Sequence, residues 1–218
     1  MTTQQQATGL RIPVRGVTLT GDLMIPDVPR GLIVFAHGSG SSRLSPRNQQ
    51  VAAALRASDF ATLLFDLLTP AEEAVDADTG YLRFDIDLLA TRLADVADWL
   101  MSNAETRDLK IGYFGASTGA AAALVAAALR PNAVGAVVSR GGRPDLAGSF
   151  LPLVYAPTLL IVGGNDRPVI AMNEGAMRRM TNAQTELVIV PGATHLFEEP
   201  GALEEVSRLA RKWFEANL

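Results

Sequence analysis

The sequence predicts one α/β domain built on a mostly parallel, doubly wound sheet with helices on both faces. Short runs of apolar residues, several of them ending at glycine, alternate along the chain with segments of helical periodicity. Strands that are apolar on both sides belong in a parallel sheet covered by helices, and their alternation with helices builds βαβ units. With 218 residues, 48% of them hydrophobic, the chain can fill the core of one such domain.

The strand predictions begin with an antiparallel pair. Residues 10–26 alternate loosely between apolar and polar side chains, which is typical of two short antiparallel strands. Continuous apolar runs follow, and we expect each of them to form a strand of the parallel sheet: 31–38, 61–68, 109–115, 133–142, 157–164 and 186–192.

Helices are predicted between and after these strands, over 45–60, 84–103, 118–129, 167–180 and 203–218. Ser45 is a suitable N-cap for the first helix, with Pro46 at its first position. The second segment has apolar residues at helical spacing. The third is mostly alanine, a strong helix former whose small side chain allows close packing on a sheet.

Domain organisation is expected to be simple. The longest irregular stretch is 68–83, which we predict to be a loop. No repeat, low-complexity tract or linker divides the chain, and no insertion is long enough for a separate cap domain. We therefore predict a single domain over residues 1–218.

Composition argues against several classes of function. A net charge of -4 gives no electrostatic reason to expect a nucleic-acid partner. No apolar run has the length of a membrane span and the first residues do not resemble a secretion signal, so we expect a cytoplasmic protein with no membrane partner. Cysteine is absent, the two histidines, His37 and His195, match no metal-ligand spacing, and no nucleotide-binding motif occurs. We therefore expect neither a metal nor a cofactor.

The functional residues are expected where strands end, because ligands of open α/β sheets gather at the carboxyl ends of the strands. Residues 115–119, GASTG, match the pattern G-x-S-x-G between a predicted strand and a predicted helix. A sharp turn at this point holds the serine in a strained conformation with its hydroxyl exposed. The flanking glycines are needed because a Cβ there would collide with the neighbouring helix or strand. Ser117 is therefore the candidate nucleophile.

A serine hydroxyl needs a base, and the base needs an acid that orients it. His195 follows the last predicted strand, and Asp166 follows the strand before it. We predict that these two residues complete a catalytic triad with Ser117. Asp66 and Asp145 are rival acids at less suitable points in the chain order. His37 ends an early strand, and we interpret it as a hydrogen-bonding residue that shapes the following loop.

Two backbone N–H groups are needed to bind the oxyanion of the reaction intermediate. Thr118, directly after the nucleophile, is predicted to supply one of them. The other should come from the loop after 31–38, from Ser39 or alternatively from Gly40. Gly38 and Gly40 allow the backbone to approach a substrate closely, so Gly40 is also a candidate for substrate binding.

Four arginines are predicted near this rim of the sheet: Arg43, Arg47, Arg140 and Arg143. Guanidinium groups there would clamp a carboxylate or phosphate of the substrate. The alternative, which we favour for the group as a whole, is ion pairing with Asp66, Asp145 or Glu72. Arg140 is the best candidate for a role in ligand binding, and Arg43 is a further one.

At these motifs the sequence resembles the α/β-hydrolase superfamily and, within it, the dienelactone-hydrolase-like group. The resemblance spans nearly the whole chain, from GLIVFAHGSGSSRLSPRN (31–48) through IGYFGASTGAAAAL (111–124) and LLIVGGNDRPVI (159–170) to PGATHLFEEPG (191–201). It implies the α/β-hydrolase fold and the triad order Ser117, Asp166, His195. Dienelactone hydrolase itself carries cysteine where this chain has Ser117, and the serine favours a broader serine esterase. Some relatives of this pattern stand beside phosphoribosyltransferase domains, which we do not expect in this sequence.

We therefore predict a cofactor-free serine hydrolase that cleaves small carboxylic esters or lactones through an acyl-enzyme on Ser117. An acyltransferase or a thioesterase would use the same residues, with a different incoming nucleophile or leaving group. A non-catalytic small-molecule binding protein on a hydrolase scaffold is the alternative from another class. The sequence gives no basis for assigning an oligomeric state.

Overall fold

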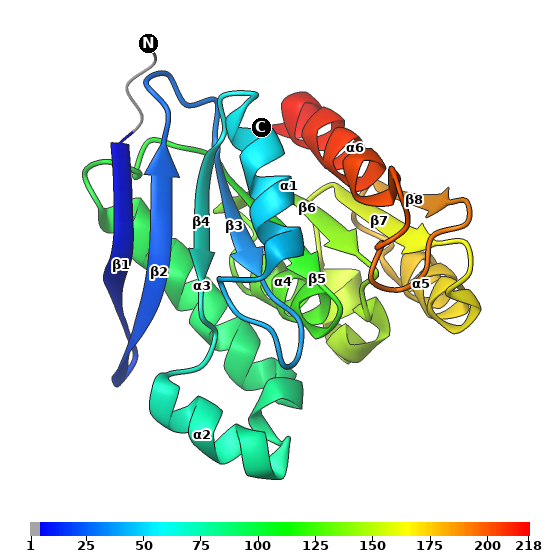
Figure 1. The fold of residues 1–218 in the computed structure, drawn as a ribbon, viewed down its shortest axis with the longest axis horizontal. Coiled ribbons are helices and arrows are strands. Elements are labelled where there is room, and N and C mark those ends of the chain that lie inside the picture. Colours follow the sequence, from blue (N-terminus) through cyan, green and yellow to red (C-terminus); the bar gives the residue numbers. More distant parts are fainter. Residues whose placement is uncertain (1–4) are drawn as a thin grey trace.

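A computed structural model describes residues 5–218 and contains one eight-stranded sheet (Figure 1). The strands are β1 (Gln5–Val14), β2 (Val17–Ile25), β3 (Leu32–Ala36), β4 (Ala61–Phe65), β5 (Ile111–Ala116), β6 (Val134–Arg140), β7 (Thr158–Gly163) and β8 (Thr185–Val190). Their order in the sheet is β1-β2-β4-β3-β5-β6-β7-β8. β1, β2 and β4 pair in antiparallel fashion, and all pairs from β4 to β8 are parallel. The predicted antiparallel pair and the predicted parallel sheet are both confirmed.

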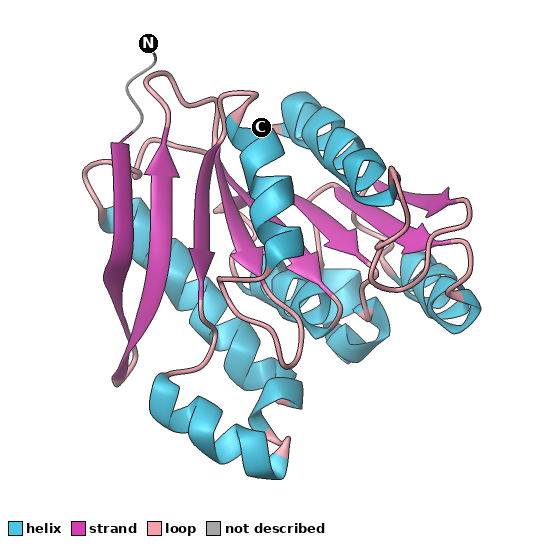
Figure 2. Ribbon diagram, viewed as in Figure 1, coloured by secondary structure: helices cyan, strands magenta, loops and turns pink. Residues whose placement is uncertain are grey.

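Helices cover both faces of the sheet, as the sequence predicts (Figure 2). They are α1 (Pro46–Arg56), α2 (Pro70–Thr79), α3 (Ile86–Ser102), α4 (Thr118–Leu129), α5 (Arg167–Arg179) and α6 (Ala202–Asn217), with 3₁₀ helices η1 (Leu82–Phe84) and η2 (Pro144–Leu153). α1 and α6 pack on one face, and α3, α4 and α5 pack on the other. Ser45 caps α1 by accepting a hydrogen bond from the N–H of Asn48 at 3.4 Å.

The prediction of a loop over 68–83 is wrong, because α2 lies within this range and η1 begins in it. Thr69 caps α2 by accepting from the N–H of Glu72, whose carboxylate in turn accepts from the N–H of Thr69. Pro70 stands at the first helical position and Gly80 ends the helix at a φ of 64°. Apolar periodicity does not find this helix, since Asp76 is its only buried residue. The capping-box pattern Thr-x-x-Glu is the sequence signal that does.

β3 and β5 lie side by side at the centre of the sheet, where the direction of chain winding reverses. After β3 the chain turns to β4 on one side, and it returns to form β5 on the other. The helices that follow β3 and β5, α1 and α4, cover opposite faces. The loops after these two strands therefore open beside each other at the carboxyl edge, the place where doubly wound sheets bind ligands.

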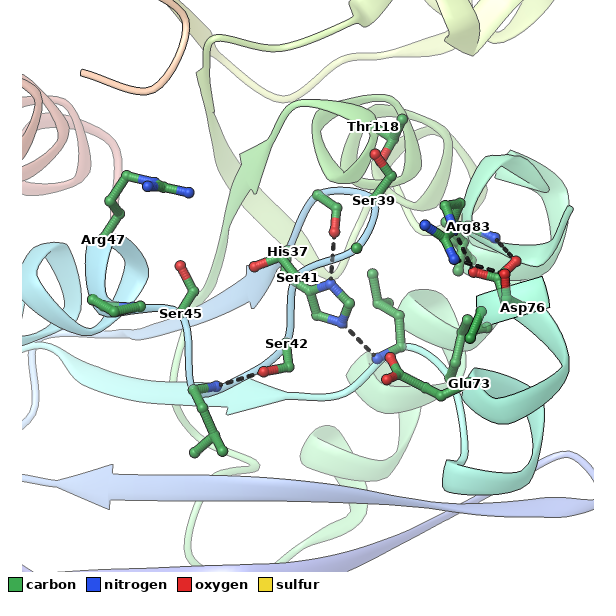
Figure 3. Close-up of a pocket in the computed structure, with 18 residues that line it drawn as sticks. His37, Ser39, Ser41, Ser42, Ser45, Arg47, Glu73, Asp76, Arg83 and Thr118 are labelled. Atoms are coloured by element: carbon green, nitrogen blue, oxygen red, sulfur yellow. Dashed lines mark hydrogen bonds and ion pairs between the residues drawn. The ribbon is translucent and has the colours of Figure 1, made fainter. Parts of the chain in front are cut away.

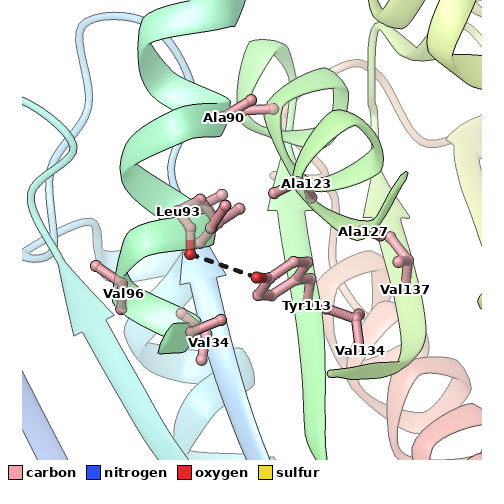
Figure 4. Packing of buried hydrophobic residues seen from close by; sticks show 14 of the residues in the cluster. Val34, Ala90, Leu93, Val96, Tyr113, Ala123, Ala127, Val134 and Val137 are labelled. Carbon is pink, nitrogen blue, oxygen red and sulfur yellow. Dashed lines mark hydrogen bonds between the residues drawn. The ribbon is translucent and has the colours of Figure 1, made fainter. Parts of the chain in front are cut away.

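The core between the sheet and the α3–α4 layer is closely packed around β5 (Figure 4). Tyr113 of β5 is fully buried there, and its hydroxyl donates to the carbonyl oxygen of Leu93 at 3.3 Å. Burial raises the pKa of Tyr113, which keeps the phenol protonated. In the described part of the chain, no helix is both long enough and apolar enough to cross a membrane.

Candidate active site

The turn between β5 and α4 holds Ser117 in a strained conformation. Its φ of 50° and ψ of -119° are rare for a residue with a side chain. A Cβ on Gly115 would lie 2.5 Å from the Cα of Ala120 in α4. A Cβ on Gly119 would lie 2.2 Å from the carbonyl oxygen of Ala36 at the end of β3. Both flanking glycines are therefore required by contacts with backbone atoms, which cannot move aside.

Backbone hydrogen bonds to the end of β6 fix this turn. The N–H of Ser117 donates to the carbonyl oxygen of Arg140 at 3.3 Å. The carbonyl oxygen of Ser117 accepts from the N–H of Arg143 at 3.0 Å and from the N–H of Ala120 at 3.1 Å. Because both backbone polar groups of Ser117 are occupied, its side chain is held at the edge of the sheet while the backbone strain is maintained.

The loops after β7 and β8 are joined closely enough to fix the side chains that they carry. The N–H of Asn165 donates to the carbonyl oxygen of Ala193 at 2.9 Å, and its side-chain amide donates to that of Gly192 at 2.8 Å. A Cβ on Gly163 would lie 2.4 Å from the carbonyl oxygen of Ala193. The acid predicted after β7 and the histidine predicted after β8 are thus carried by one rigid unit.

Asp166 and His195 are in direct contact in this unit. His195 Nδ1 lies 2.6 Å from Asp166 Oδ2, and their side chains are 37% and 14% exposed. An ionised carboxylate only accepts, so Nδ1 carries the proton and donates it to Asp166. In the neutral imidazole Nε2 is then the acceptor, and it makes no hydrogen bond to the residues that the structure describes. This is the tautomer that a general base requires.

Ser117 and His195 line the same cavity, which we call the Ser117 cavity. Its volume is about 220 Å³, and Arg140 and Arg47 also line it. A Cβ on Gly141 would lie 3.6 Å from His195 Cε1, so the end of β6 packs directly against the imidazole. The three residues of the predicted triad, from three different loops, therefore meet at one edge of the sheet.

The loop after β3 closes over Ser117 on its other side. A Cβ on Gly38 would lie 3.0 Å from Ser117 Cβ and 3.1 Å from the carbonyl oxygen of Ala116, so glycine allows the loop to approach Ser117 closely. Ser39 lines the Ser117 cavity as well. Thr118 is the first residue of α4, where backbone N–H groups have no partner within the helix. The two predicted oxyanion donors thus border the nucleophile.

His37 supports this loop (Figure 3). Its Nε2 accepts from the N–H of Leu67 at 3.0 Å, so its Nδ1 is protonated and donates to the carbonyl oxygen of Gly38 at 3.0 Å. Burial lowers the pKa of His37, which favours the neutral ring. Both ring nitrogens are occupied, in agreement with a structural role for His37 and not with that of a base.

A second and larger cavity adjoins the first, between the loop after β3 and α2 (Figure 3). We call it the α2 cavity. Its volume is about 530 Å³, and Ser39 and Thr118 line it on the side of the nucleophile. Glu73, Asp76 and Arg83 line the opposite wall, which α2 and η1 form. Apolar periodicity does not identify these residues as part of a site, because residues 68–83 are predicted to be a loop.

Two of the four rim arginines are paired with the rival acids. Arg43 binds Asp66 through its Nη1 and its backbone N–H, the latter at 2.8 Å, and its Nε lies 3.3 Å from a carboxylate oxygen of Asp22. Arg143 binds Asp145 through two hydrogen bonds of 2.9 and 2.8 Å. These ion pairs agree with the alternative favoured from the sequence. They also occupy the carboxylates of Asp66 and Asp145, the two alternatives to Asp166 as the acid of the triad.

The other two arginines, Arg47 and Arg140, face the Ser117 cavity. Arg47 makes an ion pair of 3.1 Å with Glu198. Arg140 is 7% exposed and, among residues 5–218, its guanidinium donates only to the side-chain oxygen of Asn48, at 3.3 Å. Within residues 5–218, no group of three or more histidine, aspartate and glutamate side chains is placed to hold a metal ion.

Comparison with known proteins gives close relatives. A model of the dienelactone hydrolase family matches residues 42–216. Two Mycobacterium tuberculosis proteins, from strains CDC 1551 and H37Rv, are provisionally named phosphoribosyl transferases and are 59% identical to this chain over 198 residues. The matched region covers 91% of this chain but only 44% of theirs, so the chain spans less than half the length of these curated relatives.

Solved structures show the same fold. A crystal structure of a dienelactone hydrolase from Anabaena variabilis is 59% identical, has a TM-score of 0.96 and is matched over 99% of both chains. An α/β serine hydrolase homologue from Coxiella burnetii has a TM-score of 0.75 at 17% identity, over 95% of this chain and 96% of that chain. At that identity the second likeness bears on the fold alone. The α/β-hydrolase fold without a separate cap domain, predicted from the sequence, is confirmed.

Proposed function

Because the chain belongs to the dienelactone hydrolase family, we propose that it is a serine hydrolase acting on small carboxylic esters or lactones through an acyl-enzyme on Ser117. Membership supports a hydrolase activity. The finer proposal is supported by one arrangement: Ser117, on a strained turn, shares a cavity with His195, whose Nδ1 bonds to Asp166 at 2.6 Å. A cytoplasmic location, expected from the sequence, belongs to the same proposal.

In the first half of the proposed reaction, His195 Nε2 takes the proton of Ser117 Oγ as that oxygen attacks the carbonyl carbon. Asp166 holds the imidazole in the required tautomer and stabilises the imidazolium that forms. The bond between the carbonyl carbon and the alcohol oxygen then breaks. The alcohol oxygen leaves with the proton that His195 carries, and the acyl group stays on Ser117.

In the second half, water replaces the alcohol. His195 takes a proton from the water, whose oxygen attacks the acyl carbon, and the acid leaves as the proton returns to Ser117. The N–H groups of Ser39 and Thr118 are proposed to bind the oxyanion in both halves. Such preorganised donors commonly contribute most of the stabilisation of the transition state.

Phosphoribosyl transfer is not part of this proposal. The two Mycobacterium tuberculosis relatives carry that name as whole proteins, and this chain corresponds to 44% of their length. A nucleophilic serine with a histidine–aspartate pair is suited to acyl transfer, in which the acyl group is held covalently between two steps. We therefore do not extend the name of these relatives to the site around Ser117.

The test is ester hydrolysis by the purified protein, with 4-nitrophenyl acetate and 4-nitrophenyl butyrate as substrates and γ-butyrolactone as the lactone. Ser117→Ala should lower kcat/KM by a factor of about 10³ or more, because the acyl-enzyme cannot form. Ser102→Ala, an exposed serine at the end of α3, is the matched control and should retain the wild-type value. Hydrolysis that survives in Ser117→Ala would contradict the proposal.

A further inference from the structure

Arg140 is a buried cation that has no counter-ion among residues 5–218. It ends β6, is 7% exposed and lines the Ser117 cavity together with His195. Its Nη2 donates to Asn48 Oδ1 at 3.3 Å, and its Nε is buried with no partner. In the part of the chain that the structure describes, no carboxylate pairs with it. A charge buried in this way is costly unless something else compensates it.

The surroundings of Arg140 add positive potential. Arg47 lines the same cavity, and its partner Glu198 is 64% exposed, so solvent screens that pairing. α1 starts at this cavity, since Ser45, Arg47 and Asn48 are its cap and first residues, and its first turn carries no acidic residue. The amino end of a helix favours anions. Burial and the charge of Arg47 lower the pKa of Arg140 to about 10, which leaves it protonated at neutral pH.

The position of the two cavities indicates which part of an ester reaches Arg140. His195 must protonate the leaving alcohol, and it lines the Ser117 cavity together with Arg140. Thr118, a proposed oxyanion donor, lines the α2 cavity and not the Ser117 cavity, and the residues of the loop after β3 border both cavities. In the proposed reaction, the alcohol part of the substrate is then directed toward Arg140 and the acyl part toward α2.

We propose that Arg140 and the amino end of α1 bind an anionic group carried by the alcohol part of the substrate. The substrate class is then an acyl ester of a hydroxy acid or of a hydroxyalkyl phosphate. This inference rests on the proposed function. Hydrolysis breaks the bond between the acyl carbon and the alcohol oxygen, so water supplies the new carboxyl oxygen and the alcohol departs still bound through its anion to Arg140.

Two isomeric esters test the side on which the anion lies. 3-Acetoxypropanoate carries its carboxylate on the alcohol part, and monomethyl succinate carries it on the acyl part. Their neutral analogues are butyl acetate and methyl pentanoate. A charge-assisted contact to Arg140 should raise kcat/KM for 3-acetoxypropanoate over butyl acetate by about 10- to 100-fold. Monomethyl succinate should show no such advantage over methyl pentanoate. 2-Acetoxyethyl phosphate, run beside them, distinguishes a phosphate site from a carboxylate site.

Two arginine variants separate the proposed contact from general electrostatics. Arg140→Gln should reduce the anionic-to-neutral ratio to about 1, and Arg140→Lys should restore part of it. Arg143→Gln removes a charge from the same strand end, but from an arginine paired with Asp145, and should keep the wild-type ratio. Ratios within one variant do not depend on how much of it is folded. An unchanged ratio in Arg140→Gln, or an advantage for monomethyl succinate, would overturn the inference.

A binding measurement separates failure of this inference from failure of the proposed function. Calorimetric titration of Ser117→Ala with 3-hydroxypropanoate and with 2-hydroxyethyl phosphate requires no turnover. Binding that is lost in the Ser117→Ala, Arg140→Gln double variant supports the anion site even if no ester is hydrolysed. Absence of binding of both ligands by the single variant contradicts the anion site, whatever the esterase assays show.

Discussion

Asp166 occupies a helix N-cap without capping the helix. It directly precedes α5, yet its carboxylate makes no bond to the helix and binds His195 instead. Ser45, Thr69 and Asp85, at the corresponding positions of three other helices, each accept a hydrogen bond from a backbone N–H. An N-cap side chain normally stabilises its helix by about 1 kcal/mol. That this carboxylate instead binds the imidazole supports its proposed role as the orienting acid.

Asp166→Asn should therefore lower kcat and leave the free energy of unfolding nearly unchanged. An amide in this position stabilises the wrong tautomer of His195 and does not stabilise the imidazolium, so kcat should fall about 10³- to 10⁴-fold. Because the carboxylate makes no cap bond, the free energy of unfolding in urea should change by less than about 0.5 kcal/mol. A loss of less than 10-fold in kcat would exclude Asp166 as the orienting acid.

His37 predicts how stability depends on pH. Burial lowers its pKa below the ordinary 6.5, so in acid the unfolded chain takes up a proton before the native protein does. Stability should therefore fall as the pH drops below about 6.5, by up to about 1.4 kcal/mol at pH 5.5. In the His37→Gln variant, the glutamine has a donor and an acceptor but does not titrate. Its free energy of unfolding in urea should therefore fall less between pH 7.5 and pH 5.5 than that of the wild type. An equal loss in both proteins would contradict this.

At the scale of residues, the sequence predicts which charged side chains lie at the carboxyl edge of the sheet, but not which partner each of them pairs with. The sequence suggests two roles for Asp66 and Asp145, as alternative acids of the triad or as partners of arginines. In the structure both pair with arginines. That Arg140 has no carboxylate partner among residues 5–218 follows only from the fold, which places it beside Asn48 of α1. Pairing depends on distances between loops that local sequence patterns do not specify.

At the scale of elements, most helices and strands follow from the sequence because apolar periodicity and caps agree. α4 begins and ends where its alanine-rich segment does, at Thr118 and Leu129. α2 is the exception. Its side chains line a cavity and face solvent, so it has no apolar face, and only its caps identify it. Because it forms a wall beside the proposed site, the missed helix matters for specificity.

The anchoring of α2 to α3 can be tested at Glu72. Its carboxylate receives two hydrogen bonds, of 2.7 and 2.5 Å, from the buried guanidinium of Arg92, and these hold the pKa of Glu72 down to about 2. Glu72→Gln leaves Arg92 without its counter-ion and should lower the free energy of unfolding by about 2–3 kcal/mol at neutral pH. Glu73→Gln, at the exposed neighbouring position, should cost less than about 0.5 kcal/mol.

The pH dependence of this difference has a defined sign. The carboxyl pKa is lower in the folded protein than in the unfolded chain, where it is near 4.5. The contribution is therefore complete above pH 4.5 and is lost as the pH falls toward 2. In urea unfolding, the gap between wild type and Glu72→Gln should be constant from pH 7 to pH 5.5 and should narrow below pH 4.5. A gap that widens in acid would contradict the assignment.

Two helical glycines provide a matched test of the close approach at the turn. Gly119→Ala should destabilise the protein by about 2 kcal/mol or more and abolish turnover, because its Cβ would lie 2.2 Å from the carbonyl oxygen of Ala36. Gly175→Ala in α5 meets only the end of Arg178 at 3.9 Å and should stabilise it by about 0.5–1 kcal/mol. Thermal unfolding of both variants gives the comparison. Equal effects would mean that the turn is not as tightly packed as described.

At the scale of the whole molecule, the fold is predictable because the chain from β3 onward alternates apolar strands with covering helices. That alternation allows few topologies once crossovers are right-handed. It also places strand ends together, so the sequence predicts Ser117, Asp166 and His195 at one edge of the sheet. The shapes of the two cavities are not predictable in this way, since they depend on α2 and on the path of the loop after β3.

The central claim is that Ser117 is a nucleophile activated by its position in this fold. Incubation with a fluorophosphonate, followed by peptide mass spectrometry, tests this without any assumption about the natural substrate. We expect one phosphonyl group per chain, located on Ser117, and no labelling of Ser117→Ala. Absence of a covalent adduct on the folded wild-type protein, or an adduct on another residue, would contradict the claim.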